Sequence, residues 1–183
     1  MEKTFVKPKG NIGVSQFAAA LGLSDKFLTA DQLKDQIENG YYREPNAATD
    51  FGHCKEESAR KYYEKIKKCQ VVKARYKSFD QCSRLMGICD GLIGENGGLE
   101  IKCHYNYTYP LQNVPIYYLV QVAGYLYLYN RDWFDFMSCC FDEKGEIKSY
   151  NIIRISKDEV KDQWEENWFP KLIQYTNSIN WKI

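Results

Sequence analysis

The sequence predicts an α/β protein in which a mixed sheet lies between helices. Three observations support this class: helical spacing with capping signals in the first third, strand-like runs around a glycine-rich turn in the middle, and an apolar helix followed by two strand-like runs in the second half. The length of 183 residues, 44% of them hydrophobic, suits one domain with a sizeable core, so we expect a single domain over residues 1–183.

Two helices are predicted near the N-terminus. An apolar run at residues 17–21 predicts a short helix that stops at Gly22. Thr29 and Gln32 have the spacing of a capping box, which predicts a second helix that continues to about Glu38.

A third helix is predicted from about Thr49 to Lys68. Helical spacing places a mostly apolar set on one face, namely Gly52, Glu56, Ala59, Tyr63 and Ile66. Glu56 is therefore an acid on an apolar stripe, which makes it a candidate site residue. Glu57 falls on the polar face and is expected to be an ordinary solvated residue.

The middle of the chain is predicted to form strands near Val71–Phe79 and Leu85–Cys89, followed by a turn that begins at Asp90-Gly91. Asn96–Gly98 then leads into a further strand.

A helix is predicted from Pro115 to about Tyr129, and Gln121 is its one strongly polar residue from 117 onward. Strands are expected near Trp133–Phe141 and Ser149–Ile155.

A second capping box, Ser156 and Glu159, predicts a final helix to about Phe169. We expect Pro170 to end or kink this helix.

The strand after the glycine-rich turn carries the most informative residues of the chain. Side chains alternate along a strand, so Glu100 and Lys102 share one face, and Asp90 precedes Glu100 by ten residues. Two carboxylates that converge beside a lysine form a site for a hard divalent cation. This is the minimal set for metal-assisted phosphodiester hydrolysis.

Four segments in this order resemble the PD-(D/E)xK nuclease superfamily, and within it the group of phage lambda exonuclease and YqaJ-type viral recombinases. They are Gly13–Leu21, Gly52–Ala59, Asp90–Leu92 with Gly98–Cys103, and the helix that contains Gln121. One departure is Cys89, where the family often has proline before the aspartate.

The resemblance implies a restriction-endonuclease-like fold, with a mixed central sheet flanked by helices. It also implies a catalytic set of five residues, which are Lys102, Glu100, Asp90, Glu56 and Gln121. Lys102 would contact the attacking water or the scissile phosphate, and Gln121 would orient the water or a carboxylate. The alternative for Gln121 is a buried amide satisfied by the backbone.

The metal ligands that the resemblance implies are Asp90, Glu100 and the backbone carbonyl of Ile101, with Glu56 acting through a water or on a second ion. The cofactor would be Mg²⁺, and Mn²⁺ should substitute because the ligands are hard oxygens.

The resemblance also implies contacts with DNA. Ser15, with Lys7 or Lys9, matches the region that grips a terminal 5′-phosphate, although Ser15 could equally be a simple N-cap residue. Arg60 and Lys61 are candidate DNA contacts on a different ground, because they begin a basic segment of the sequence.

The charge distribution supports these contacts. The net charge is only +1, but residues 60–77 hold eight basic residues and the single acid Glu64, which gives +7. The basic residues are Arg60, Lys61, Lys65, Lys67, Lys68, Lys73, Arg75 and Lys77. Such a patch either contacts phosphates or forms a solvated helix face.

Two further groups could take part in function. His53 and His104 are isolated histidines, and the implied mechanism requires neither of them. Tyr105, Tyr107 and Tyr109 alternate before a proline, so they could stack on unpaired bases or pack at a strand edge.

We therefore expect a Mg²⁺-dependent deoxyribonuclease, a 5′→3′ exonuclease that degrades duplex DNA from free ends in viral or phage recombination. A single-strand annealing protein is an expected partner, and a homotrimer an expected assembly. The alternatives are an endonuclease or an RNA-cutting viral nuclease of the same fold, or a DNA-binding module without catalysis.

Seven cysteines, no signal-peptide core and no C-x-x-C pair predict reduced thiols in a protein that is intracellular, in the cytoplasm or a host-cell compartment of a virus or phage, and not secreted. No apolar run is long enough for a membrane span.

Overall fold

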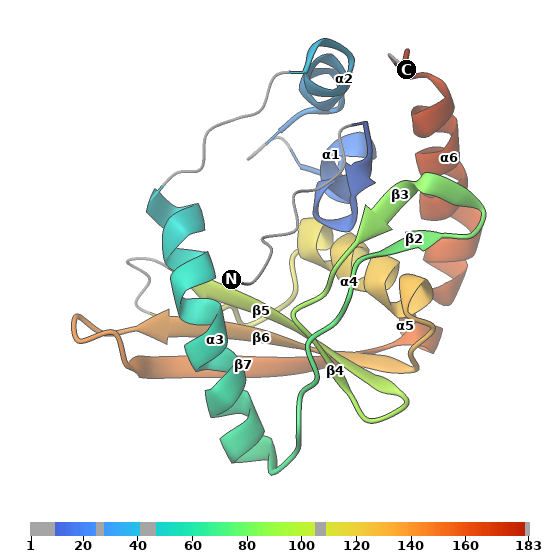
Figure 1. Cartoon of the computed structure of the whole chain (residues 1–183). Coiled ribbons are helices and arrows are strands. Elements are labelled where there is room, and N and C mark those ends of the chain that lie inside the picture. Colours follow the sequence, from blue (N-terminus) through green and yellow to red (C-terminus); the bar gives the residue numbers. More distant parts are fainter. Residues whose placement is uncertain (1–9, 25–27, 41–46, 105–108, 182–183) are drawn as a thin grey trace.

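Two sheets and the helices around them form the protein (Figure 1). The computed structural model describes residues 10–24, 28–40, 47–104 and 109–181. One sheet has four strands in the order β4-β5-β6-β7, and the other has three strands in the order β1-β3-β2. The predicted α/β class is confirmed, and the three-stranded sheet is an addition to the mixed sheet that the sequence indicated.

The four-stranded sheet is mixed, as predicted. Its strands are β4 (Gly91–Ile93), β5 (Gly97–His104), β6 (Trp133–Phe141) and β7 (Ile147–Ser156). β5 and β6 run parallel, and the other two pairs are antiparallel. The parallel pair needs a crossover, which includes α4 (Ile116–Leu128).

Helices cover both faces of this sheet (Figure 1). On one face α3 (Ala47–Lys67) places Ala59 and Tyr63 in a buried cluster with Leu99 and Ile101 of β5. On the other face, α4 and the N-terminal elements pack over Phe134 and Phe136 of β6, in the larger core. β5 is therefore enclosed on both sides.

Strand register places the side chains of two predicted site residues, Glu100 and Lys102, on the α4 face of the sheet. Glu100 is the pairing partner of Phe136, and Lys102 is the partner of Ser138. Since paired residues point to the same face, Glu100 and Lys102 lie on the side opposite Leu99 and the α3 cluster. The predicted alternation along this strand is confirmed.

The smaller sheet carries the N-terminal segment. Its strands are β1 (Ile12–Gly13), β2 (Lys77–Phe79) and β3 (Cys82–Gly87), with β1 parallel to β3. The 3-10 turn η1 (Val14–Gln16) and the short helix α1 (Phe17–Ala20) follow β1 directly. η1 therefore lies beside the segment that leads from β3 toward Asp90.

The predicted strand Val71–Phe79 is wrong over most of its length. Only Lys77–Phe79 is a strand, and Val72 makes one isolated antiparallel bridge with Leu92. Lys73 is exposed, because this stretch crosses between the end of α3 and the smaller sheet instead of lying inside a sheet.

The predicted turn at Asp90-Gly91 is also wrong, because β4 begins at Gly91. The chain turns instead at residues 94–96, where Gly94 has a φ of +53°. A Cβ atom at Gly91 would collide with Val71, so glycine is required for close approach and not for a turn.

The C-terminal helix is longer than predicted. The capping box of Ser156 and Glu159 is confirmed at the start of α5 (Lys157–Gln163). A π-helical stretch, Trp164–Trp168, then leads into α6 (Phe169–Asn177), so Pro170 does not end the helix, and the predicted alternative, a kink, stays a prediction. A π-helical turn offers an alternative bonding pattern just before a residue that has no N–H to donate.

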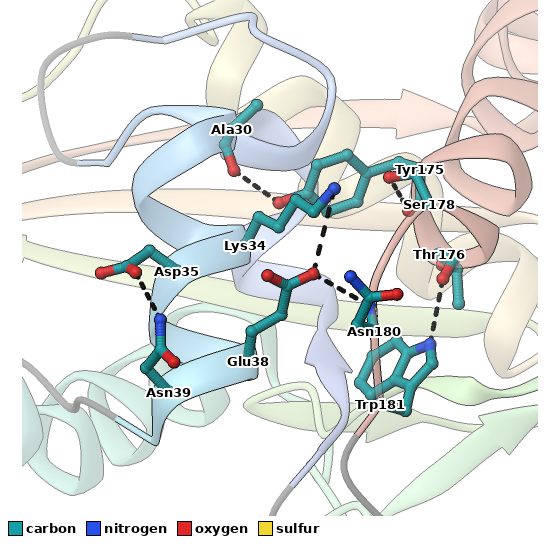
Figure 2. A network of polar contacts seen from close by, with 10 residues as sticks. All are labelled: Ala30, Lys34, Asp35, Glu38, Asn39, Tyr175, Thr176, Ser178, Asn180 and Trp181. Atoms are coloured by element: carbon teal, nitrogen blue, oxygen red, sulfur yellow. Dashed lines mark hydrogen bonds and ion pairs between the residues drawn. The ribbon is translucent and has the colours of Figure 1, made fainter.

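Helix α2 (Ala30–Asn39) is attached to the C-terminal segment by polar contacts (Figure 2). The Tyr175 hydroxyl donates to the Ala30 carbonyl over 2.6 Å, and the backbone N–H of Asn180 donates to Glu38 Oε1 over 2.9 Å. These contacts supplement a small apolar interface, in which Leu33 is the buried residue of α2. The predicted capping box of α2 is confirmed.

None of the helices in the described part of the chain is long and apolar enough to cross a membrane. All seven cysteines are free thiols.

The close approach of Gly98 to the Phe134 ring leads to a prediction about stability. Gly98→Ala should lower the free energy of unfolding by about 1–3 kcal/mol, because the added methyl group would collide with the buried Phe134 ring. Gly52→Ala in α3 is the matched control, since open space surrounds its Cβ position and alanine should stabilise the helix by up to about 1 kcal/mol. Urea unfolding measures both, and equal changes would contradict this account of Gly98.

Candidate active site

Asp90 lies at the point where β5 loses its neighbour β4. β4 pairs with β5 from Gly97 to Leu99, and the next outward-facing N–H, that of Ile101, donates to Asp90 Oδ2 over 2.6 Å. The Asp90 carboxylate thus accepts the hydrogen bond that a neighbouring strand would otherwise accept at this edge of the sheet. This bond fixes Asp90 beside Glu100.

The backbone carbonyl of Ile101 faces the same edge. In an extended strand the N–H and C=O groups of one residue point to the same side, so the carbonyl lies on the side of Asp90. The predicted backbone ligand is therefore oriented toward the carboxylate cluster.

Glu100 is 2% exposed, and its two oxygens have unequal surroundings. Oε1 accepts a hydrogen bond from Lys102 Nζ and another from Gln121 Nε2, each over 2.7 Å. Oε2 is buried and has no hydrogen-bond partner among the described residues. A water, a proton shared with a neighbouring carboxyl group or a cation would satisfy this oxygen.

Burial and neighbouring carboxylates raise the pKa values of Asp90 and Glu100. Burial raises the pKa of Asp90 well above its usual value, and the charges of Glu100 and Glu56 add to the rise. Burial also raises the pKa of Glu100, Lys102 opposes the rise, and Glu56 adds to it. The charge of Glu56 on α3 therefore acts on the same cluster. Its role as a site residue stays a prediction.

Lys102 remains an ammonium group at neutral pH. Burial disfavours the charged form, but the carboxylates of Glu100 and Asp90 outweigh burial and raise its pKa. The Tyr118 ring centroid is 4.9 Å from Nζ. These surroundings favour a role for Lys102 as a positioned cation over a role in proton transfer.

Gln121 holds a carboxylate. Its side chain is buried, and Nε2 is also 3.3 Å from the Tyr125 hydroxyl. Gly124 on the next turn lets Val14 come close, because a Cβ atom there would be 2.8 Å from Val14 Cγ1. The amide therefore orients Glu100 from a helix that is itself closely packed.

A pocket of about 310 Å³ opens between α3 and the segment that leads to Asp90. Its lining residues are His53, Glu56, Glu57, Arg60, Lys73, Ala74, Ile88, Cys89 and Asp90. Two of the predicted catalytic carboxylates, those of Glu56 and Asp90, thus face a space that a ligand can enter.

The residues fit a divalent cation. The donor set consists of hard oxygens, the carboxylates repel one another, and Glu100 Oε2 is buried without a donor among the described residues. No three His, Cys, Asp or Glu side chains in the described part of the chain are grouped closely enough to hold an ion by themselves. The direct set expected here needs only two carboxylates, Asp90 and Glu100, with the Ile101 carbonyl.

Residues 6–132 match the YqaJ-like viral recombinase domain. The chain belongs to this family. The family resemblance that the sequence motifs indicated is thereby confirmed. No match was found among curated proteins.

Solved structures share the fold of this YqaJ-like domain. LHK-Exo, an alkaline exonuclease from Laribacter hongkongensis, in its complex with dAMP, is 20% identical with a TM-score of 0.73, over 92% of this chain and 89% of that one. A phage-related exonuclease from Haemophilus somnus 129PT is 15% identical with a TM-score of 0.64, over 91% and 94%. The restriction-endonuclease-like arrangement predicted from the family is consistent with this shared fold.

Of the three residues predicted to bind a 5′-phosphate, only Ser15 lies among the described residues. Ser15 is exposed in η1, but it is not the N-cap residue, which is Gly13, whose N–H donates to Gln16 Oε1. Lys7 and Lys9 lie outside the described residues. A role for Ser15 in phosphate binding stays a prediction.

The predicted DNA contacts on α3 differ from each other. Arg60 is 6% exposed and forms a hydrogen bond with Glu57, while the Lys61 side chain is 71% exposed. Glu57 was expected to be an ordinary solvated residue, yet it lines the pocket and contacts three basic side chains. Its spacing to Arg60 and Lys61 was a signal for two of these contacts. The contact of Glu57 with Lys73 could not be predicted from spacing along the helix, because Lys73 lies outside α3.

The two histidines and the tyrosines occupy different places. His53 lines the pocket. His104 Nε2 is 2.8 Å from Ser138 Oγ, and burial followed by the charge of Lys102 lowers its pKa. Tyr109 is 75% exposed, and Tyr105 and Tyr107 lie outside the described residues.

The raised carboxyl pKa values predict how the stability of the metal-free protein depends on pH. The folded-state pKa of Asp90 lies above the unfolded value of about 4. At a pH between the unfolded and the folded pKa, the folded protein therefore binds more protons than the unfolded chain. The stability that the protonated Asp90 contributes is present at low pH and is lost as pH rises through the folded pKa. Asp90→Asn should therefore stabilise the metal-free protein at pH 8 by about 0.5–2 kcal/mol, and by less near pH 4.

Thermal unfolding in EDTA at several pH values measures this difference. Asp80→Asn is the control, because Asp80 is exposed in the turn between β2 and β3. A stabilisation by Asp90→Asn that does not change with pH would contradict the assignment of repulsion to this cluster.

Proposed function

We propose that this YqaJ-like domain is a divalent-metal-dependent deoxyribonuclease. The observation that carries the proposal is the paired carboxylates of Asp90 and Glu100, with one buried oxygen of Glu100 unpaired among the described residues and the Lys102 ammonium 2.7 Å from the other. Carboxylate oxygens beside a fixed cation suit the hydrolysis of a phosphodiester, in which negative charge accumulates on phosphate oxygens.

We further propose that it acts as a 5′→3′ exonuclease on duplex DNA with free ends. Membership of a viral recombinase family supports a role in DNA processing. Two solved proteins of the same fold are described as exonucleases, one of them in complex with dAMP. An annealing protein as partner and a homotrimer are further expectations from the family.

Each residue has a role that follows from its contacts. Bound Mg²⁺, held by Asp90, Glu100 and the Ile101 carbonyl, would act as a Lewis acid and activate water for attack. Gln121 keeps the Glu100 carboxylate in one orientation. Lys102 presents a fixed positive charge to the scissile phosphate or its attacking water.

Other activities remain as alternatives within the same site. An endonuclease or an RNA-cutting nuclease would use the same carboxylates and differ in how the nucleic acid reaches them. A DNA-binding module without catalysis is disfavoured, because Asp90, Glu100, Lys102 and Gln121 are all present and in contact or electrostatically coupled.

The activity proposal predicts that Lys102→Gln lowers kcat on duplex DNA at least about 100-fold in Mg²⁺, because a preorganised charge at the reacting phosphate is removed. Lys171→Gln, an exposed change of the same charge on α6, is the control and should leave kcat within twofold. Hydrolysis at the normal rate by the Lys102 variant would refute its assignment.

The substrate is identified with end-labelled linear duplex, closed circular duplex and RNA of the same sequence. We expect progressive loss of linear duplex, faster from 5′-phosphate than from 5′-hydroxyl ends, in Mg²⁺ or Mn²⁺ and not in EDTA. Nicking of circles would favour the endonuclease alternative.

Metal binding is testable without measuring activity. Mg²⁺ at about 100 times its Kd should raise the free energy of unfolding of the wild-type protein by about 2.7 kcal/mol. Asp90→Asn should abolish most of this gain, because one of the two carboxylate ligands is lost. Calorimetric unfolding with and without Mg²⁺ makes the comparison, and an equal gain in both proteins would place the ion elsewhere.

A further inference from the structure

Glu57 is the centre of a group of positive charges at the pocket. Its carboxylate forms a hydrogen bond with Arg60 and lies 3.8 Å from Lys61 Nζ and 3.7 Å from Lys73 Nζ. One negative charge therefore faces three positive charges, which leaves the group at +2. A structural ion pair would need only one of these partners.

The fold holds Lys73 in this group. Lys73 belongs to the crossing segment after α3, and this segment is fixed at two points. The Val71 N–H donates to Glu64 Oε1 over 2.8 Å, and Val72 exchanges two backbone hydrogen bonds of 2.8 Å with Leu92 of β4. The cations thus come from two separate parts of the chain.

The position of this group of charges at the pocket indicates a function for it. Glu57, Arg60 and Lys73 line the same pocket as Glu56 and Asp90. A DNA backbone that approaches these carboxylates meets like charge, so its phosphates need cations close by. The planar fork of Arg60 suits a phosphate especially well.

Burial differs between the partners. The Arg60 side chain is 8% exposed, whereas the Glu57 side chain is 49% exposed. The arginine side chain is almost fully enclosed, while the carboxylate can move into water at little cost. An external anion can therefore replace Glu57 without unfolding any element.

We propose that Arg60 and Lys73 form a subsite for a DNA backbone phosphate, and that the Glu57 carboxylate occupies this subsite until DNA displaces it. The inference rests on the proposed function and identifies the substrate group that the pocket binds. Glu57 keeps the cations ordered in the free protein and weakens DNA binding by competing with the phosphate.

The test measures the Kd for a 5′-phosphorylated duplex in EDTA, by fluorescence anisotropy at one fixed salt concentration. Glu57→Gln should tighten binding about three- to tenfold, because a partly exposed ion pair no longer competes. Glu166→Gln is the matched control, since it makes the same charge change at an exposed position in the π-helical stretch. Equal effects of the two variants would overturn the proposal.

A double variant isolates the competition. Lys73→Gln should weaken binding about three- to tenfold, and adding Glu57→Gln to it should give a smaller gain than in the wild-type background. The Lys73 side chain is 67% exposed, so this variant keeps the fold, and its unfolding midpoint verifies this. An unchanged gain from Glu57→Gln in the double variant would show that the two residues do not share a ligand.

The outcomes separate this inference from the proposed function. If the wild-type protein cleaves DNA but Glu57→Gln behaves like Glu166→Gln, only the subsite is wrong. If Glu57→Gln tightens binding but no metal supports cleavage, the subsite stands and the nuclease proposal fails. If the wild-type protein binds no DNA, the subsite is overturned as well.

Discussion

The hydrogen bond from the Ile101 N–H to Asp90 Oδ2 is the contact on which the arrangement of the site depends. It forms where β4 no longer pairs with β5, so a carboxylate takes a bond that a strand would otherwise accept. This bond holds Asp90 at the edge of the buried strand β5, beside Glu100, which is the residue before Ile101. The exposed edge of a sheet, usually a liability, becomes the place where carboxylate and carbonyl oxygens gather.

The cluster is stable as a whole because the rest of the fold is closely packed around it. Burial raises the pKa of both Asp90 and Glu100, and the charge of Glu56 adds to both rises, so each group disfavours the charged state that would hold a metal ion. Lys102 and Gln121 offset part of this cost at a single oxygen of Glu100. A divalent cation bound as proposed would relieve the remaining imbalance, so local instability and the proposed metal affinity would have the same physical origin.

Sequence reasoning succeeded where the signal is local. Alternation fixed the shared face of Glu100 and Lys102, and capping boxes gave the starts of α2 and α5. It failed where the cause lies far along the chain. Gly91 looks like a turn residue, but its role is to let Val71 approach β4. The contact between Lys73 and Glu57 depends in the same way on a bridge between Val72 and Leu92, which no local pattern encodes.

The basic segment at residues 60–77 shows why net charge alone describes such a surface poorly. Seven of its eight cations are exposed, and Arg60 alone is buried, against a pocket that also contains Asp90. Exposed lysines attract a polyanion from a distance and are screened by salt. A buried guanidinium acts only at contact, with fixed geometry. The segment therefore combines the long-range attraction of its exposed cations with one fixed guanidinium, that of Arg60. In the proposed subsite, the Glu57 carboxylate neutralises this guanidinium while no phosphate is bound.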